Sequence, residues 1–116
     1  ALGRVFLASW SEADLKSYFE RVDFVRRTEF TLVTPAKVAH ELERVRRSGY
    51  SIVDQEFELK VGSIAAPVQD LLGNVVAAIC VVFQVSDVSK RELLDRFLPA
   101  LKKGALQLKD RLAEIS

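Results

Sequence analysis

The sequence reads GYSIVDQE at residues 49–56, SIAAPV at 63–68 and DLLGNVVAA at 70–78, and this stretch decides the fold. Apolar and polar residues alternate along residues 50–59, which predicts a strand whose successive side chains point to opposite faces. Residues 63–68 predict a second strand, in which Pro67 favours a sheet edge or the strand's own end. Residues 75–85 are almost wholly apolar and predict a third strand, inside a sheet that is covered on both sides.

Two helix starts are marked upstream of these strands. Ser11 is a typical N-cap, and it predicts an amphipathic helix over residues 11–22. Thr34-Pro35 predicts a second helix, which Gly49 ends as a left-handed residue. The remaining upstream residues predict a helix end at 1–9 and a loop or short extended piece at 24–33.

The last predicted helix follows the strands. Ser89 and Glu92 begin it as a capping box, and Pro99 is expected to kink it because proline has no amide hydrogen. An apolar stripe runs along this helix through Leu94, Phe97, Leu98, Leu101, Ala105, Leu108 and Leu112. The stripe can cover the sheet or form a dimer seam, and covering the sheet is the favoured interpretation. Since the strands are joined by turns of hairpin length, the sequence predicts an α+β fold with an antiparallel meander.

The composition is that of one small globular domain. The chain has 116 residues, of which 49% are hydrophobic and 28% charged. Its net charge of +1 does not indicate a basic surface that would bind nucleic acid or an acidic membrane. Cys80 is the only cysteine, so an intrachain disulfide is excluded. With no apolar run long enough to cross a membrane and no signal-peptide pattern, a cytoplasmic protein is expected. Apolar first residues without an initiator methionine suggest a fragment of a larger chain.

Candidate catalytic groups are few. Cys80 and His40 are the only possible nucleophile–base pair, but Cys80 lies in the most apolar strand and is expected to be an inert core or cavity-lining residue. Asp54, Glu56 and Glu58 alternate along one predicted strand face, where a hard cation can bind, although a solvated face is favoured. The sequence contains no glycine-rich phosphate loop. This pattern favours a binding module without a cofactor over an enzyme.

A series of short motifs resembles the effector-binding domain of IclR-type bacterial transcriptional regulators. ALGRVFLA at residues 1–8 is similar to the family's A-x-G-[KR]-x-x-L-A helix. The Thr34-Pro35 start, Leu42, Arg46, Gly49-Tyr50, IAAPV at 64–68 and GNVVAA at 73–78 follow in the family's order and spacing. The run VDQEFE at 53–58 looks closest to the branch that regulates aromatic-acid catabolism. The resemblance implies a GAF-like antiparallel sheet flanked by helices.

The resemblance also implies a function. Family members bind operator DNA through an N-terminal winged helix-turn-helix, which this sequence lacks, so residues 1–116 are expected to be a sensor domain that is incomplete at its N-terminal side. The expected partners are a small carboxylate or aromatic acid and further copies of the protein in a homodimer or tetramer, with no membrane contact. The alternative is a GAF-like sensor or oligomerisation module of another signalling protein, and a small enzyme using Cys80 is a third hypothesis.

The resemblance places the effector over the sheet, against Ala1, Leu2, Val53, Val61, Ser63, Cys80 and Val82. A helix that begins at Ala1 and Leu2 would offer backbone N–H groups to a carboxylate. Ser63 would add a hydroxyl, and the valines and Cys80 would form an apolar wall with room for a ring. Two features depart from the family. Lys60 stands where glycine is usual and Gly62 where a polar residue is usual, and Val53 stands where aspartate is frequent, which favours a more apolar effector.

Overall fold

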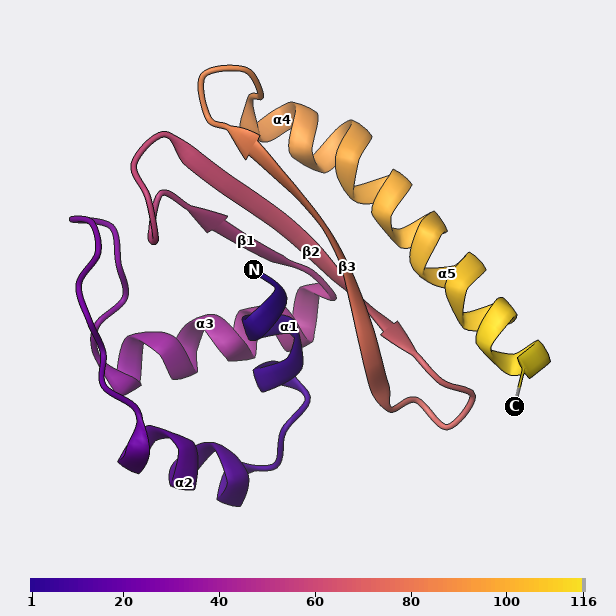
Figure 1. The fold of residues 1–116 in the computed structure, drawn as a ribbon, viewed down its shortest axis with the longest axis horizontal. Coiled ribbons are helices and arrows are strands. Elements are labelled where there is room, and N and C mark those ends of the chain that lie inside the picture. Colours follow the sequence, from indigo (N-terminus) through magenta and orange to yellow (C-terminus); the bar gives the residue numbers. More distant parts are fainter. Residues whose placement is uncertain (116) are drawn as a thin grey trace.

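The computed structural model describes residues 1–115, with helices packed on both sides of a small sheet (Figure 1). The elements follow along the chain as α1 (Leu2–Ala8), α2 (Glu12–Arg21), α3 (Pro35–Ser48), β1 (Ser51–Asp54), β2 (Val61–Gln69), β3 (Val75–Gln84), α4 (Lys90–Glu92), the π-helical turn η1 (Leu93–Phe97) and α5 (Leu98–Ile115). The strands pair antiparallel in the order β1-β2-β3, which confirms the predicted α+β meander. No helix within residues 1–115 is long and apolar enough to span a membrane.

The predicted helix ends are confirmed by their caps. The Ser11 hydroxyl accepts a hydrogen bond from the backbone of Asp14, and the Thr34 hydroxyl accepts one from Lys37. Gly49 ends α3 with φ of 78°, a left-handed conformation that costs glycine little. These local signals set where α2 and α3 begin and where the chain turns into β1.

Two apolar cores lie on opposite sides of the sheet. One joins the first three helices around Leu42, and the other packs Ile64 and Ala66 of β2 against Leu101 of α5. Because side chains alternate along a strand, Ser63 and its odd-numbered neighbours in β2 face the side on which α1 lies. In Figure 1, α1 and α3 accordingly lie on one side of the sheet and α5 runs along the other.

β1 is shorter than predicted. The strand expected at 50–59 ends at Asp54, and residues 55–60 form the loop to β2. Gln55 and Lys60 have φ of 58° and 69°, values that do not occur in a regular strand. The hydroxyls of Thr28 and Thr31 donate hydrogen bonds to the carbonyls of Gln55 and Glu56, so a distant loop satisfies groups that a longer strand would have paired. The apolar residues of the loop are therefore exposed, namely Phe57 and Leu59.

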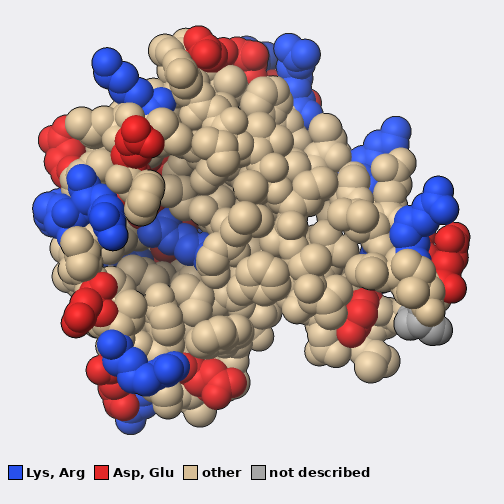
Figure 2. Space-filling view, viewed as in Figure 1, with Lys and Arg blue, Asp and Glu red and all other residues tan. Residues whose placement is uncertain are grey.

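Within residues 1–115, β3 lies at the edge of the sheet, which differs from the prediction that it lies inside a sheet covered on both sides. Within residues 1–115, β2 occupies the centre and β3 has a strand partner on one side only. Val76 and Val82 are largely exposed, whereas Ile64 and Ala65 of β2 are fully buried. Figure 2 shows charged side chains mainly around the periphery and a broad uncharged surface in the middle. Pro67 lies near the end of β2, past the last residue that pairs with β1, as predicted.

The last helix is interrupted by a wide turn. Residues 93–97 form the π-helical turn that precedes Pro99, so the irregularity predicted at this proline takes the form of a π turn. Leu101 and Ala105 are buried and α5 contacts β2, which confirms that the apolar stripe covers the sheet. Farther along α5, Leu108 and Leu112 are exposed.

Candidate functional site

The strand register brings four of the predicted site residues together on the α1 side of the sheet. Val53 pairs with Ser63, and Ser63 pairs with Val82, so these three residues form one row across the strands. The next row on the same face contains Ser51, Ala65 and Cys80. Because neighbouring rows on one face are two residues apart, Cys80 lies next to the row that contains Ser63.

α1 begins over this surface. Ala1 is the N-cap of α1, and its nitrogen lies 3.4 Å from the Ser63 hydroxyl oxygen. This distance places the start of α1 beside Ser63. Backbone N–H groups in the first turn of a helix have no partner within the helix, so hydrogen-bond donors lie beside Ser63.

A cavity of about 420 Å³ opens beside this surface. It lies between α1, β1 and the loop from α2 to α3, and Ala1 and Val53 from the predicted set line it. Phe24, Arg27 and Thr31 form part of its loop wall. Pockets for small organic molecules have about this size, with mostly apolar walls and a few polar groups.

The ion pair between Arg4 and Glu56 joins two walls of this cavity. Arg4 donates two hydrogen bonds to the Glu56 carboxylate, and the bond from Nη1 to Oε2 is 2.7 Å long. Both side chains are mostly buried, so the pair fastens α1 to the loop between β1 and β2. Glu56 also lines a second cavity on the opposite side of β1.

The other predicted residues lie at the margin of this site. Ser63 and Cys80 are half-buried and lie beside the cavity, but they do not line it. Leu2 and Val82 are exposed, and Val61, the first residue of β2, pairs with Gln84. The set is thus gathered on one side of the sheet, with only Ala1 and Val53 in the cavity wall.

Sequence reasoning missed Arg4, Arg27 and Glu56 as lining residues. The available signal for Arg4 was its place in the A-x-G-[KR] motif. Arg27 lies over the Phe57 ring, 5.2 Å from the ring centroid, and no spacing rule connects this loop with a hairpin so far along the chain. Asp54, Glu56 and Glu58 do not share a strand face as predicted, because β1 ends at Asp54 and Glu56 pairs with Arg4.

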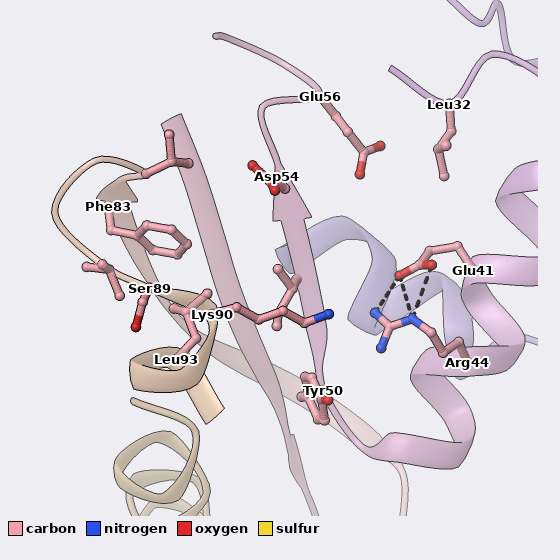
Figure 3. A pocket seen from close by; sticks show the side chains of 13 residues that line it. Leu32, Glu41, Arg44, Tyr50, Asp54, Glu56, Phe83, Ser89, Lys90 and Leu93 are labelled. Atoms are coloured by element: carbon pink, nitrogen blue, oxygen red, sulfur yellow. Dashed lines mark hydrogen bonds and ion pairs between the residues drawn. The ribbon is translucent and has the colours of Figure 1, made fainter. Parts of the chain in front are cut away.

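The second cavity is larger, about 620 Å³, and lies on the other face of β1 (Figure 3). Tyr50, Ile52 and Phe83 contribute its apolar surface. Figure 3 shows the Glu41–Arg44 ion pair on one wall and Lys90 reaching across from another. The hydrogen bond with Glu41 raises the pKa of the Arg44 guanidinium. None of the seven predicted site residues lines this cavity.

Catalytic or metal chemistry has no geometric support in the described part of the chain. Cys80 is half-buried on the sheet, and His40 is exposed on α3. Within residues 1–115 no group of three or more His, Cys, Asp or Glu side chains is placed to hold a metal ion.

Comparison with known proteins identifies a family. The family described as "Bacterial transcriptional regulator IclR C-terminal" matches residues 1–110. The Pca regulon regulatory protein of Pseudomonas putida is 38% identical over 93% of this chain and 37% of its own length. The p-hydroxybenzoate hydroxylase transcriptional activator of Acinetobacter baylyi is 29% identical over 93% of the chain and 40% of its own length. The chain therefore spans about two fifths of the length of these relatives.

Solved structures share the fold. A transcriptional regulator from Rhodococcus sp. RHA1 superposes with a TM-score of 0.96 at 30% identity, over 99% of this chain and 47% of that one. The inducer-binding domain of the Acinetobacter transcription factor PobR, a double mutant in complex with 3-hydroxybenzoic acid, gives a TM-score of 0.89 at 30% identity, over 93% and 62% of the two chains.

These relatives are transcriptional regulators and not enzymes, which disfavours the hypotheses of a Cys80 enzyme and of an unrelated signalling module. The match along residues 1–110 and the shared fold show that this chain belongs to the family of IclR-type bacterial transcriptional regulators and corresponds to their C-terminal domain.

Proposed function

We propose that this chain is the part of a bacterial regulator that senses a small aromatic carboxylate and so controls operator binding by a separate DNA-binding domain. The observation that carries the proposal is the row of Val53, Ser63 and Val82 under the start of α1. The PobR inducer-binding domain, which has the same fold, was solved as a double mutant in complex with 3-hydroxybenzoic acid. An aromatic acid offers one flat apolar body and one anionic end, which suits this combination of groups.

Each side chain has a distinct role in the proposed complex. The Ser63 hydroxyl and the backbone N–H groups at Ala1 and Leu2 face the carboxylate, and Arg27 adds positive charge from the loop. Val53, Val61 and Val82 contact the ring. Cys80 acts as a small, polarisable wall that leaves room for it.

The longer regulator would be a homodimer or tetramer in the bacterial cytoplasm, and it would contact DNA only through its other domain. An effector changes such a protein only by binding one arrangement of the subunits more tightly than another. The partners proposed are therefore a small acid and further copies of the same chain. The similarity to the Pca regulon and p-hydroxybenzoate regulators supports aromatic catabolism as the controlled process.

Isothermal titration calorimetry with 3-hydroxybenzoate, 4-hydroxybenzoate, pyruvate and glyoxylate tests the proposal. We expect a hydroxybenzoate to bind, and a concentration of one hundred times the dissociation constant to stabilise the fold by about 2.7 kcal/mol. Ser63→Ala should weaken binding by roughly tenfold, because one hydrogen bond to a charged group is lost. Ser86→Ala is the matched control, since Ser86 is exposed in the turn after β3. Binding that is unaffected by Ser63→Ala would contradict the site.

A further inference from the structure

The larger of the two cavities has an apolar floor that is formed by the α5 face of the sheet. Ile52 of β1 and Phe83 of β3 line it, and both side chains are half-buried. Gly62 stands between Asp54 and Phe83 in one row across the strands. The Phe83 ring lies over Gly62, 2.7 Å from the place that a Cβ atom would take, so the ring covers the strand closely at this point. Binding sites for small organic molecules have apolar walls of this kind.

Two cations face this cavity from different walls. Lys90 comes from α4 and Arg44 from α3, and Figure 3 shows their charged ends pointing toward one another across the cavity. Arg44 is paired with Glu41, whereas none of the ion pairs formed within residues 1–115 includes Lys90. Because like charges repel each other, an anion between Lys90 and Arg44 would relieve an unfavourable arrangement.

Carboxylates lie at the other end of the cavity. Asp54 and Glu56 line it there, and Figure 3 shows both side chains away from the two cations. Glu56 is held by Arg4, while Asp54 accepts a 3.2 Å hydrogen bond from the neighbouring Gln55. An ionised carboxylate only accepts hydrogen bonds, so this end suits a hydroxyl group and disfavours an acid group. The charges of the cavity thus set the direction in which a ligand lies.

We propose that this cavity is a second binding site of the chain, for a small organic acid that also carries a hydroxyl group. The carboxylate of the ligand lies between Lys90 and Arg44, and its apolar body lies on Ile52 and Phe83. Its hydroxyl donates a hydrogen bond to Asp54. None of the seven residues predicted for the effector site lines this cavity. The inference therefore does not depend on the proposed function, and either site can fail alone.

Titration of the chain with 4-hydroxybenzoate, followed by amide NMR, tests the second site. We expect one group of amide signals to shift around Ile52 and Lys90, with its own dissociation constant, whatever happens around Ser63. Ser63→Ala should leave the shifts around Ile52 and Lys90 unchanged. If those signals do not move at millimolar 4-hydroxybenzoate, the second site is overturned, whether or not the α1 face binds the acid.

Substitution of Lys90 provides the second measurement. Lys90→Gln should weaken binding on the α5 face at least tenfold, because a hydrogen bond between two charged groups is lost, and Lys90→Arg should restore most of it. Lys103→Gln is the matched control, since Lys103 is another exposed lysine and lies outside the cavity. Lys90 is exposed, so its variants should fold, and circular dichroism verifies this. Equal affinities of Lys90→Gln and the wild-type chain would overturn the site.

Two further probes test the class of ligand. Benzoate lacks the hydroxyl and should bind the α5 face several-fold more weakly than 4-hydroxybenzoate. Asp54→Ala should weaken the binding of 4-hydroxybenzoate and leave that of benzoate unchanged. Inorganic phosphate carries negative charge without an apolar body, and it should bind at least tenfold more weakly than either acid. Phosphate that binds as tightly as 4-hydroxybenzoate would overturn the assignment to an organic acid.

Discussion

The two faces of the sheet are built by alternate residues of the same strands, yet they carry different groups. On the α5 side, Ile64 and Ala66 are buried in a continuous apolar core. On the α1 side, the rows contain Ser51, Ser63 and Cys80. Alternation allows one strand to supply stability to one side and a binding surface to the other. Substitutions at adjacent residues should therefore separate the two roles.

Ile64→Ala should have the largest effect on stability. The side chain is fully buried against α5, so its truncation leaves a cavity and should lower the free energy of unfolding by about 2–5 kcal/mol. Ser63→Ala, at the adjacent residue on the other face, should change it by less than about 1 kcal/mol. Urea unfolding of both variants measures the difference. Equal losses would mean that the faces are not separated as described.

Gly62→Ala should be the next most harmful. A methyl group at Gly62 would lie 2.7 Å from the ring of Phe83, its partner across β2 and β3. Such overpacking costs about 1–3 kcal/mol. A double-mutant cycle with Phe83→Leu tests the cause, because the smaller side chain should recover part of the loss. An additive cycle would show that the ring is not responsible.

Ser51→Ala should stabilise the protein. Ser51 is fully buried on the α1 side, and its hydroxyl has no hydrogen-bond partner within the described residues. Removing an unpaired buried hydroxyl should raise the free energy of unfolding by roughly 1 kcal/mol. Thermal denaturation should then show a midpoint several degrees higher. A lower midpoint would indicate that the hydroxyl has a partner after all.

Lys60→Gly should have the smallest effect, also stabilising. Lys60 has φ of 69°, where a side chain is strained and glycine is not. The gain is reduced because glycine is more flexible in the unfolded chain, which leaves about 0.5 kcal/mol. Lys60→Ala serves as the control for loss of charge, and it should not stabilise. Chemical denaturation with closely spaced points resolves a difference of this size.

Local chemistry predicted the helices and the order of the strands, because a capping serine or a left-handed glycine acts over a few residues. The family resemblance named Val53, Ser63 and Val82 as site residues, and the strand register places these three in one row. The end of β1 could not be predicted, since it depends on hydroxyls of Thr28 and Thr31 in a distant loop. The position of β3 at the edge of the sheet within residues 1–115 was missed for a related reason. An apolar sequence shows that a strand favours burial, but the order in which the strands pair determines whether that strand is buried.

The ion pair between Arg4 and Glu56 has a consequence for communication across β1. Glu56 borders both large cavities, one on each face. A ligand that draws the Glu56 carboxylate toward the larger cavity must break the ion pair with Arg4. The start of α1, which lies over Ser63, then loses this attachment to the loop between β1 and β2. If an acid binds beside Ser63 as proposed, and its affinity depends on the position of α1, thermodynamic reciprocity makes it change the affinity of the opposite cavity for its ligand by the same factor. The Glu56 carboxylate is the one charged group that lines both of these cavities, so its position can couple ligand binding in one to ligand binding in the other.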